Sequence, residues 1–415
     1  MKSFSFRDFN TPFFEEIKDV NELALTYNRF PIVPFQGLNE ESADNILNVL
    51  HRLSEITPIY AGILQSIQQF VLGAGIEAIK TNNNLFGQVS ELSEEEALAF
   101  GEILNDKLFE TDINDLLSKM LSGLLVDGNI GLKVRVSTTG KVTIKFISQK
   151  YFRYLKEDFT ESQKRVLISP TFVYDYLITV KPYSVPLYPV WDDLENGAKE
   201  TFFHFKESRV DRDLYGLSYA ASSLMNQYLV NQVISYLSAE TDNRFTGQIL
   251  FDVPVPPSQE SEMGLEGMQL VKDLRNVFKS KGQGESIMVH FRDDETGELK
   301  VHEFKSNTNE KFYETIRNIV NEEIVTAFAW DKRLIGISRE NGLGGNDMEA
   351  IFKIASMKVR RLQRQLENAI NTVLLAISRQ AGFEEMSEKG IKLKSLYEES
   401  IISENKVEDE LDNAE

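Results

Sequence analysis

An apolar stripe at helical spacing crosses the C-terminal part of the chain and constrains its fold more than any other feature. Side chains three and four residues apart share one face of an α-helix, so the stripe predicts one long helix over residues 347–383. Asn346 and Glu349 form a capping-box pair at its start, and Gly382 ends it. The 42% apolar content provides the core against which such a helix can pack. The stripe consists of Ala355, Val359, Leu362, Leu366, Ile370, Val373 and Ile377.

Two further predicted helices bracket a compact α/β insert. The first covers residues 216–246, with Ser218 as its candidate N-cap, and the second covers residues 306–330. The insert, residues 247–305, contains a strand (GQILF), a proline-rich connector (VPVPP), a polar helix and a hairpin. The hairpin is expected to pair SIMVHF with ELKVHEF across DDETG.

The N-terminal half predicts an α+β arrangement, with helices first and a small antiparallel sheet after them. Its clearest strand signal is the hairpin IGLKVRV–STTG–KVTIKFI, in which Gly140 can adopt a positive φ. The acid-rich residues 384–415 are expected to be flexible or weakly helical. The other elements expected here are helices over 39–53, 59–79, from Ser93 onward and 113–125, and strands over 165–169, 171–180 and 201–205.

The absence of cysteine excludes disulfides, thiolate zinc sites and a cysteine nucleophile. The most apolar stretch, residues 59–79, is interrupted by Gln65, Ser66, Gln68 and Gln69, which predicts a packed helix rather than a membrane span. No N-terminal signal is recognised, and no membrane partner is expected.

The formal net charge of −19 argues against a protein that holds nucleic acid over its whole surface. Two interpretations remain open. The charge can simply keep the protein in solution, or it can form an acidic wall that lets a DNA duplex slide without sticking.

No catalytic constellation is found. The four histidines, His51, His204, His290 and His302, form no metal-binding pattern, and no phosphate-binding loop is present. His290 and His302 would face each other across the predicted hairpin, as a cross-strand pair. The protein is therefore not expected to be an enzyme or to require a cofactor or metal. Acidic pairs that could bind Mg²⁺ are Asp192 with Asp193, Asp211 with Asp213, and Glu240 with Asp242.

Four segments, in order, resemble the portal (head–tail connector) proteins of tailed bacteriophages. They are DLLSKMLSGLLVDGNIGLKV, LYGLS following FHFKES, ETDNRFTGQILF, and EEIVTAFAWDKRLIGI. The match in order and spacing extends from near Ile56 to Leu375, and it departs from the family where Trp330, Asp331 and Lys332 replace a frequent Val-Pro-Pro. The motif residues that are expected to have a structural role are Tyr215, Gly216, Ser218, Gly247 and Gly336.

The resemblance implies an α+β portal-type fold with an α/β wing, a two-helix stem, a small α/β clip and a long C-terminal crown or wing helix. The wing is residues 1–215, the stem 216–246 and 306–330, and the clip 247–305. Residues 331–346 form the candidate tunnel loop, 347–383 the crown helix and 384–415 the acidic tail.

The resemblance also implies a dodecameric ring at one capsid vertex that conducts double-stranded DNA during packaging and ejection. Its expected partners are the terminase large subunit, the major capsid and scaffold proteins, and head-completion or tail adaptor proteins. Its expected location is the virion, and the host bacterial cytoplasm during assembly.

The resemblance suggests three groups of candidate site residues, and none of them is expected to bind a metal. The tunnel loop would meet DNA through Lys332, Arg333, Arg339, Asn341, Gly342, Gly344 and Gly345. The subunit interface would use Lys353, Arg360, Arg361 and Arg364. Terminase docking on the clip would use Asp273, Arg275, Lys279 and Lys281. The alternatives are a metal-dependent nuclease or phosphotransferase that uses the acidic pairs, and a helical adaptor that forms no ring.

Overall fold

The computed structural model describes 15 stretches of the chain. These are residues 32–33, 35, 45–80, 90–104, 112–156, 164–170, 172, 182–210, 213–242, 249–255, 287–293, 300–303, 310–336, 345–381 and 388–396. The chain divides into two compact units. The first combines residues 1–224 with 324–415, and the second is the intervening segment 225–323.

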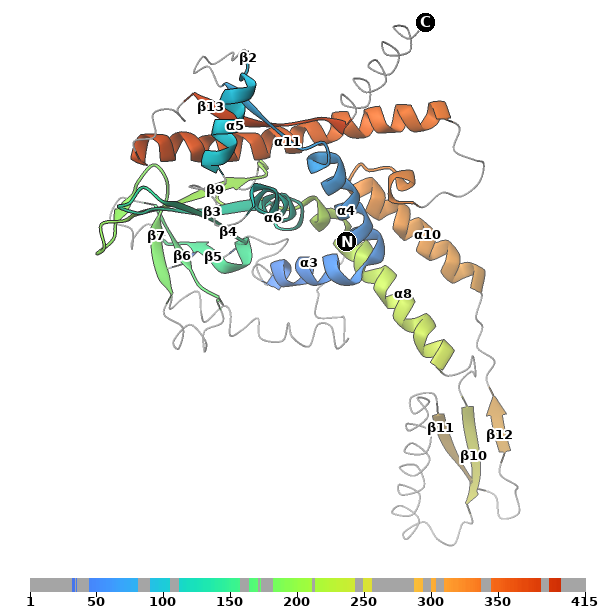
Figure 1. Ribbon diagram of the computed structural model, residues 1–415. Coiled ribbons are helices and arrows are strands. Elements are labelled where there is room, and N and C mark those ends of the chain that lie inside the picture. Colours follow the sequence, from blue (N-terminus) through green and yellow to red (C-terminus); the bar gives the residue numbers. More distant parts are fainter. Residues whose placement is uncertain are drawn as a thin grey trace, which may run out of the picture. The chain divides into compact units, whose positions relative to one another are not determined.

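Helices of the first unit pack around an antiparallel sheet. Figure 1 shows the longest helix, α11, lying across strands β3 and β9. The helices are α3 (Asn45–Ile56), α4 (Pro58–Leu72), α5 (Glu94–Ile103), α6 (Ile113–Val126) and α11 (Gly345–Ala381), with 3₁₀ turns η4 (Gln149–Tyr151), η6 (Tyr219–Ser223) and η8 (Lys332–Ile335). The long stripe predicted for residues 347–383 is therefore one helix, as expected.

Among the described residues, three sheets belong to the first unit, and the strand pairings within them are antiparallel. The sheet β4–β3–β9–β8 is formed by Val142–Ile147, Asn129–Val136, Lys199–Lys206 and Asp192–Asp193. The sheet β5–β6–β7 is formed by Phe152–Tyr154, Arg165–Ile168 and Tyr183–Pro186. The sheet β13–β1–β2 is formed by Lys389–Leu393, Ile76–Lys80 and Ser90–Glu91.

The helices-then-sheet prediction for the N-terminal half is confirmed. The predicted hairpin is β3–β4, in which Val136 pairs with Val142 and Gly140 has a φ of 79°. A large apolar cluster connects this sheet to the helices. Its fully buried aromatic side chains are Phe35, Tyr60, Phe152, Phe202 and Tyr215.

Two expectations for the first unit are corrected. The helix expected over residues 59–79 ends at Leu72, because Gly75 turns the chain with a φ of 85° into strand β1. The acidic tail is not wholly flexible or helical, because β13 lies within it and pairs with β1 from Ile76↔Leu393 to Lys80↔Lys389.

The second unit contains most of α8 (Leu224–Asp242), most of α10 (Glu310–Ala327) and a three-stranded sheet. The sheet has the order β11–β10–β12, with β10 (Ile249–Val255) in the centre, β11 (Ile287–Asp293) parallel to it and β12 (Lys300–Glu303) antiparallel.

The predicted hairpin between SIMVHF and ELKVHEF is therefore wrong, because β10 lies between β11 and β12. His290 pairs with Asp252 and His302 with Leu250, so the two histidines are not cross-strand neighbours. The strand predicted at GQILF also continues into the proline-rich segment as far as Val255.

Within the described residues, no helix combines the length and apolarity that crossing a bilayer requires.

Candidate functional site

The Gly-Asn and Tyr-Gly-Leu-Ser motifs meet in one buried junction. Asn129, at the start of β3, is fully buried and bridges the two segments. Its Oδ1 accepts hydrogen bonds from the Gly216 amide (2.7 Å) and His204 Nε2 (3.0 Å). Its Nδ2 donates to the carbonyls of Asp127 (2.8 Å) and Gly216 (3.2 Å). The motifs thus join the α6–β3 turn to the segment that leads into α8.

The two chain segments approach too closely for a side chain at this junction. A Cβ at Gly216 would lie 2.1 Å from the carbonyl oxygen of Gly128, and Gly128 itself has a φ of 76°. Glycine is therefore required at Gly216 by the lack of space and at Gly128 by the backbone conformation.

Tyr215 and Ser218 extend the junction to neighbouring elements. The Tyr215 hydroxyl donates to the Val33 carbonyl (2.9 Å) and accepts from the Tyr154 amide (2.8 Å). Ser218 caps η6 by accepting from the Ala220 amide (2.9 Å), and its hydroxyl donates to the Leu125 carbonyl. Ser218 was expected to cap a long α-helix, whereas a short 3₁₀ turn intervenes before α8 begins.

His204 serves this junction as a neutral group. Burial, with the nearby charge of Lys206, lowers its pKa to about 3. Its Nδ1 lies 2.6 Å from the Tyr154 hydroxyl while Nε2 faces Asn129 Oδ1, which already accepts the Gly216 amide. The tautomer with the proton on Nε2 satisfies both contacts, so His204 is a structural residue here.

The start of the candidate tunnel loop is anchored on α4. Trp330 Nε1 donates to the Ser66 hydroxyl (3.1 Å), and that hydroxyl donates to the Leu334 carbonyl (3.0 Å). The Trp330 ring also packs edge-on against Phe70. These contacts give a structural role to Trp330, one of the three residues that replace the Val-Pro-Pro frequent in the portal proteins that the sequence resembles.

Arg333 is engaged within the loop itself. Its guanidinium donates to both carboxylate oxygens of Asp331, from Nε at 3.0 Å and from a terminal nitrogen at 2.8 Å. The Arg333 side chain lowers the pKa of Asp331, which also caps η8. η8 then ends at Gly336, whose φ is 78°. Lys332 lies beside Arg333 in η8.

Several predicted residues lie outside the described part of the chain. They are Arg339, Asn341, Gly342 and Gly344 of the loop, Gly247, and the clip residues Asp273, Arg275, Lys279 and Lys281. Gly345 is the first residue of α11. The structure therefore describes the start of the candidate loop, from Asp331 to Gly336, and its last two residues, which belong to α11.

The four predicted interface residues of α11 divide into two groups. Arg360 lies 3.0 Å from Glu367 and also donates to the Leu393 carbonyl, so it joins α11 to β13. Arg361 pairs with Glu207, which is buried and also accepts from Gln365 (2.8 Å) and Tyr219 (3.0 Å). Lys353 and Arg364 are exposed on the outer side of the helix.

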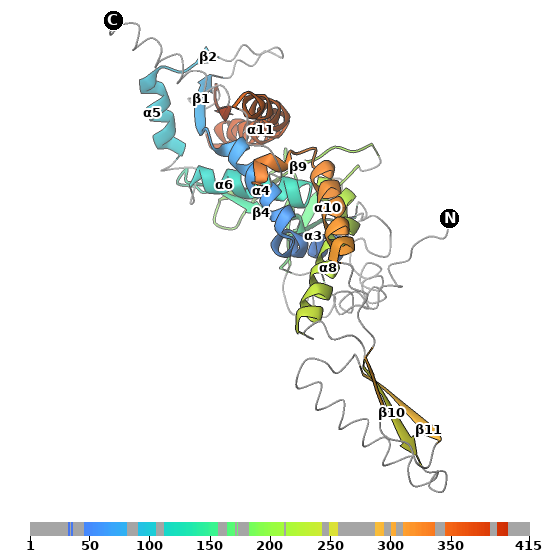
Figure 2. The same cartoon turned by 90° about the vertical axis from the view of Figure 1, so that its right-hand side faces the viewer.

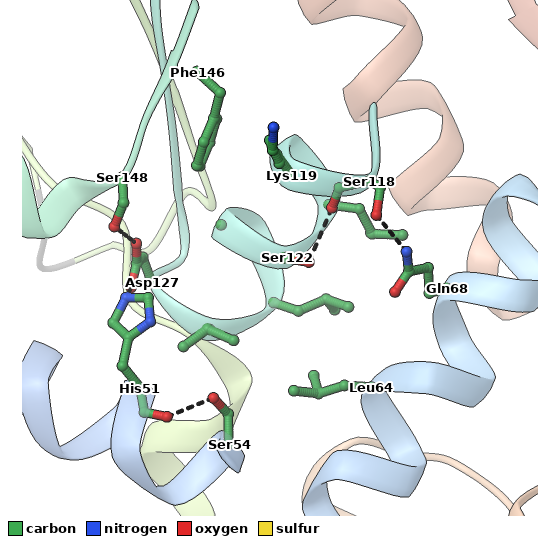
Figure 3. Close-up of a pocket in the computed structure, with 14 residues that line it drawn as sticks. His51, Ser54, Leu64, Gln68, Ser118, Lys119, Ser122, Asp127, Phe146 and Ser148 are labelled. Carbon is green, nitrogen blue, oxygen red and sulfur yellow. Dashed lines mark hydrogen bonds and ion pairs between the residues drawn. The ribbon is translucent and has the colours of Figure 1, made fainter. Parts of the chain in front are cut away.

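A pocket that the sequence did not reveal lies between α3, α4 and α6, with both polar and apolar side chains in its lining (Figure 3). Its volume is about 280 Å³. Asp127, at the end of α6, is fully buried beside it and contacts His51 Nε2 at 2.7 Å and the Ser148 hydroxyl at 2.7 Å. The two contacts hold α3 and the segment after β4 to the end of α6. Asp127 belongs to the segment DLLSKMLSGLLVDGNIGLKV, but its partners His51 and Ser148 lie outside the four segments that resemble the portal family, which is why sequence reasoning missed the site.

Asp211 and the side chains of Glu240 and Asp242 are not described, so of the acidic pairs only Asp192 with Asp193 lies wholly within the described residues. No group of three or more His, Asp or Glu side chains there is placed to hold a metal ion. Asp192 forms a two-point contact with Arg165, at 3.2 and 2.6 Å.

No protein-family profile matches the chain, and no curated protein does. A chain from the virion of the native gene transfer agent particle superimposes with a TM-score of 0.52 at 11% identity, covering 95% of both chains. A chain from the neck of the empty gene transfer agent particle, computed with C6 symmetry, gives a TM-score of 0.51 at 12% identity, covering 90% of both. The chain has the fold of these particle proteins. The α+β fold expected from the sequence is confirmed.

An HK97 family phage portal protein from Corynebacterium diphtheriae also superimposes, with a TM-score of 0.45 at 10% identity. The alignment covers 83% of this chain and 94% of that chain.

Proposed function

We propose that this chain is a phage portal protein, one subunit of a ring at a single capsid vertex through which double-stranded DNA enters and leaves. The ring is a dodecamer and hydrolyses nothing itself. It docks the terminase large subunit on the clip, and it contacts the capsid, scaffold and head-completion or tail adaptor proteins. It acts in the virion after assembly in the bacterial cytoplasm.

The observation that carries this proposal is a fold likeness over nearly the whole chain to proteins of gene transfer agent particles, one of them from a neck with C6 symmetry. A twelve-subunit ring is compatible with that symmetry. The four ordered sequence segments independently resemble the portal family, and two of them meet in the Asn129–Gly216 junction. The residues of these two segments therefore have a structural role, because they join the α6–β3 turn to the segment that leads into α8.

The loop after α10 is the proposed constriction on DNA. Its basic side chains, Lys332, Arg333 and Arg339, provide a few sequence-independent phosphate contacts within a chain of net charge −19. The Arg333–Asp331 pair favours a weak contact, because the carboxylate offsets part of the positive charge. Weak contact suits a channel through which DNA must slide.

Electron microscopy of the purified full-length protein in negative stain, with mass photometry alongside, tests the ring. Closed rings with a central channel and a mass near that of twelve subunits support the proposal. Because some rings need a scaffold to assemble, the measurement is repeated with the cognate scaffold co-expressed. A chain that stays monomeric in both conditions contradicts the portal function and favours an adaptor that forms no ring.

Deletion of residues 337–345 tests the loop. We expect the deletion to leave ring assembly intact and to impair packaging or retention of DNA in particles. The matched control replaces the same residues with a glycine-serine segment of equal length, which separates loop length from loop chemistry. Normal DNA filling of particles that carry the deletion would contradict the role of the loop.

A further inference from the structure

One outward face of α11 combines apolar and basic side chains. Ile354 is 53% exposed and Met357 is 71% exposed, although helix positions that bury a stripe on one side usually carry polar residues on the other. Arg361 and Arg364 follow at spacings of four and seven residues from Met357, so they extend the same face. The Arg361 side chain is held by Glu207 and stays 61% exposed. We name this face, Ile354, Met357, Arg361 and Arg364, the basic ridge.

An outward face of α5 has the opposite charge around a similar apolar centre. Leu98 is 71% exposed. Glu94 and Glu102 lie one helical turn to either side of it, and Glu95 lies three residues before it; all three are exposed. The helix buries Phe100 on its other side. We name this face, Glu94, Glu95, Leu98 and Glu102, the acidic ridge.

The two ridges lie on helices separated by a sheet. Figure 2 shows α5 on one side of β1 and α11 on the other. β1 pairs with β13, and β13 is bound to α11 through Arg360 and through Asn371, which contacts both the amide and the carbonyl of Ile391. Because the sheet separates the two helices, each ridge is available to a different neighbour.

We propose that the basic ridge of one subunit docks on the acidic ridge of the next copy of this chain. The inference rests on the proposed ring and names the surfaces that build it. Two different, complementary faces on one chain define a heterologous contact, and heterologous contacts repeated by rotation close into a ring. We infer that the partner is a second copy because one chain carries both complementary surfaces. The basic ridge surrounds apolar side chains with cations, and the acidic ridge surrounds an apolar side chain with carboxylates.

Thiol cross-linking tests the contact directly, because the natural chain has no cysteine. A Leu98→Cys protein is mixed with a Met357→Cys protein and treated with a short bismaleimide. Both positions are exposed, so neither substitution removes buried packing. We expect a covalent dimer in the mixture and little dimer when either variant is treated alone.

The outcomes of cross-linking separate this inference from the ring itself. Rings in the microscope without the mixed cross-link would overturn the ridge pairing and leave the portal proposal standing. A cross-link that forms equally well in Leu98→Cys alone would indicate a symmetric contact and overturn it too. A protein that stays monomeric and uncross-linked, with scaffold present, contradicts both proposals.

Charge exchange provides a second test. Arg364→Glu and Glu102→Lys are each expected to weaken subunit association by roughly tenfold, and the double variant is expected to recover most of the loss. Glu102 lies in the last turn of α5, where a lysine does not weaken the helix. The control is Lys141→Glu in the exposed β3–β4 turn, which should assemble as the unmodified chain does. Single variants that assemble normally would overturn the ridge pairing.

Discussion

The Nε2 atom of His51 lies 2.7 Å from the Oδ1 atom of Asp127, whose side chain is fully buried. Asp127 caps the C-terminal end of α6, where the negative end of the helix dipole disfavours a carboxylate. The charge is stabilised by the imidazole, the Ser148 hydroxyl and the Gln149 amide. The pair therefore compensates a buried charge at a helix end and joins α3 to α6.

The stability contribution of this pair should depend on pH. Burial opposes protonation of His51, and Lys150 does so too, but Asp127, with a smaller contribution from Glu55, outweighs them and raises the His51 pKa above 6.5. A raised pKa in the folded state gives stability that is fully present below pH 6.5 and is lost as the pH rises through the folded-state pKa. We expect His51→Gln to lower the free energy of unfolding by about 1–3 kcal/mol in mild acid and by less at alkaline pH.

Urea denaturation of both proteins across this pH range measures the difference. The control is Lys119→Gln, which removes an exposed ion pair with Asp115 and should cost well under about 1 kcal/mol at every pH. A His51→Gln effect that does not change with pH would show that the pair is not ionic.

Gly216 should tolerate no side chain. In Gly216→Ala, the Cβ would lie 2.1 Å from the Gly128 carbonyl oxygen and 2.9 Å from the Glu207 amide, so the two segments must separate. We expect a loss of about 3 kcal/mol in the free energy of unfolding. Gly101→Ala, in α5, is the matched control, because its Cβ meets nothing within 4 Å and should stabilise the helix by about 0.5–1 kcal/mol. Equal thermal stability of the two variants would refute this account of the motif.

Asn129→Ala should be costly because it leaves several buried polar groups without partners. The Gly216 amide and the Asp127 carbonyl each lose a buried hydrogen bond, and His204 Nε2 loses a part-buried one. We expect a loss of about 3 kcal/mol, against less than about 1 kcal/mol for Asn114→Ala on the exposed start of α6. Calorimetry of the two variants provides the comparison.

Ser66→Ala should loosen the start of the proposed tunnel loop. The substitution removes the acceptor for the buried Trp330 indole and the donor to the Leu334 carbonyl. We expect hydrogen exchange in residues 331–336 to accelerate by about tenfold while exchange in β3 stays unchanged. Ser122→Ala, on the exposed side of α6, is the control. Unchanged exchange in the loop would show that the Phe70 packing alone holds Trp330.

Local signals were sufficient for much of the fold. The β3–β4 hairpin and the long α11 follow from turn residues and periodicity within the segments themselves. Long-range pairing was not visible in the same way. By its sequence alone, β1 resembles the end of a helix, whereas in the structure it pairs along its whole length with β13, from the C-terminal part of the chain.

The second unit shows the same limit. β11 and β12 are adjacent in sequence and resemble a hairpin, but β10 separates them by pairing in parallel with β11. A parallel pair needs a long crossover connection, which residues 256–286 supply, and a turn signal alone does not exclude that topology. For the site, Asp127 and His51 belong to different helices and share no motif, so their contact is set by the packing of α3 on α6.

The pairing of β1 with β13 also has a consequence for synthesis. The first unit is interrupted in sequence by the second, and its sheet takes one strand from residues 76–80 and another from residues 389–393. A ribosome releases the whole of segment 225–323 long before β13 emerges, so the inserted unit can fold while the enclosing unit still lacks an edge strand and α11. In a chain truncated before residue 389, we therefore expect the inserted unit to fold and the enclosing unit to remain incompletely folded, exposed to proteases and chaperones.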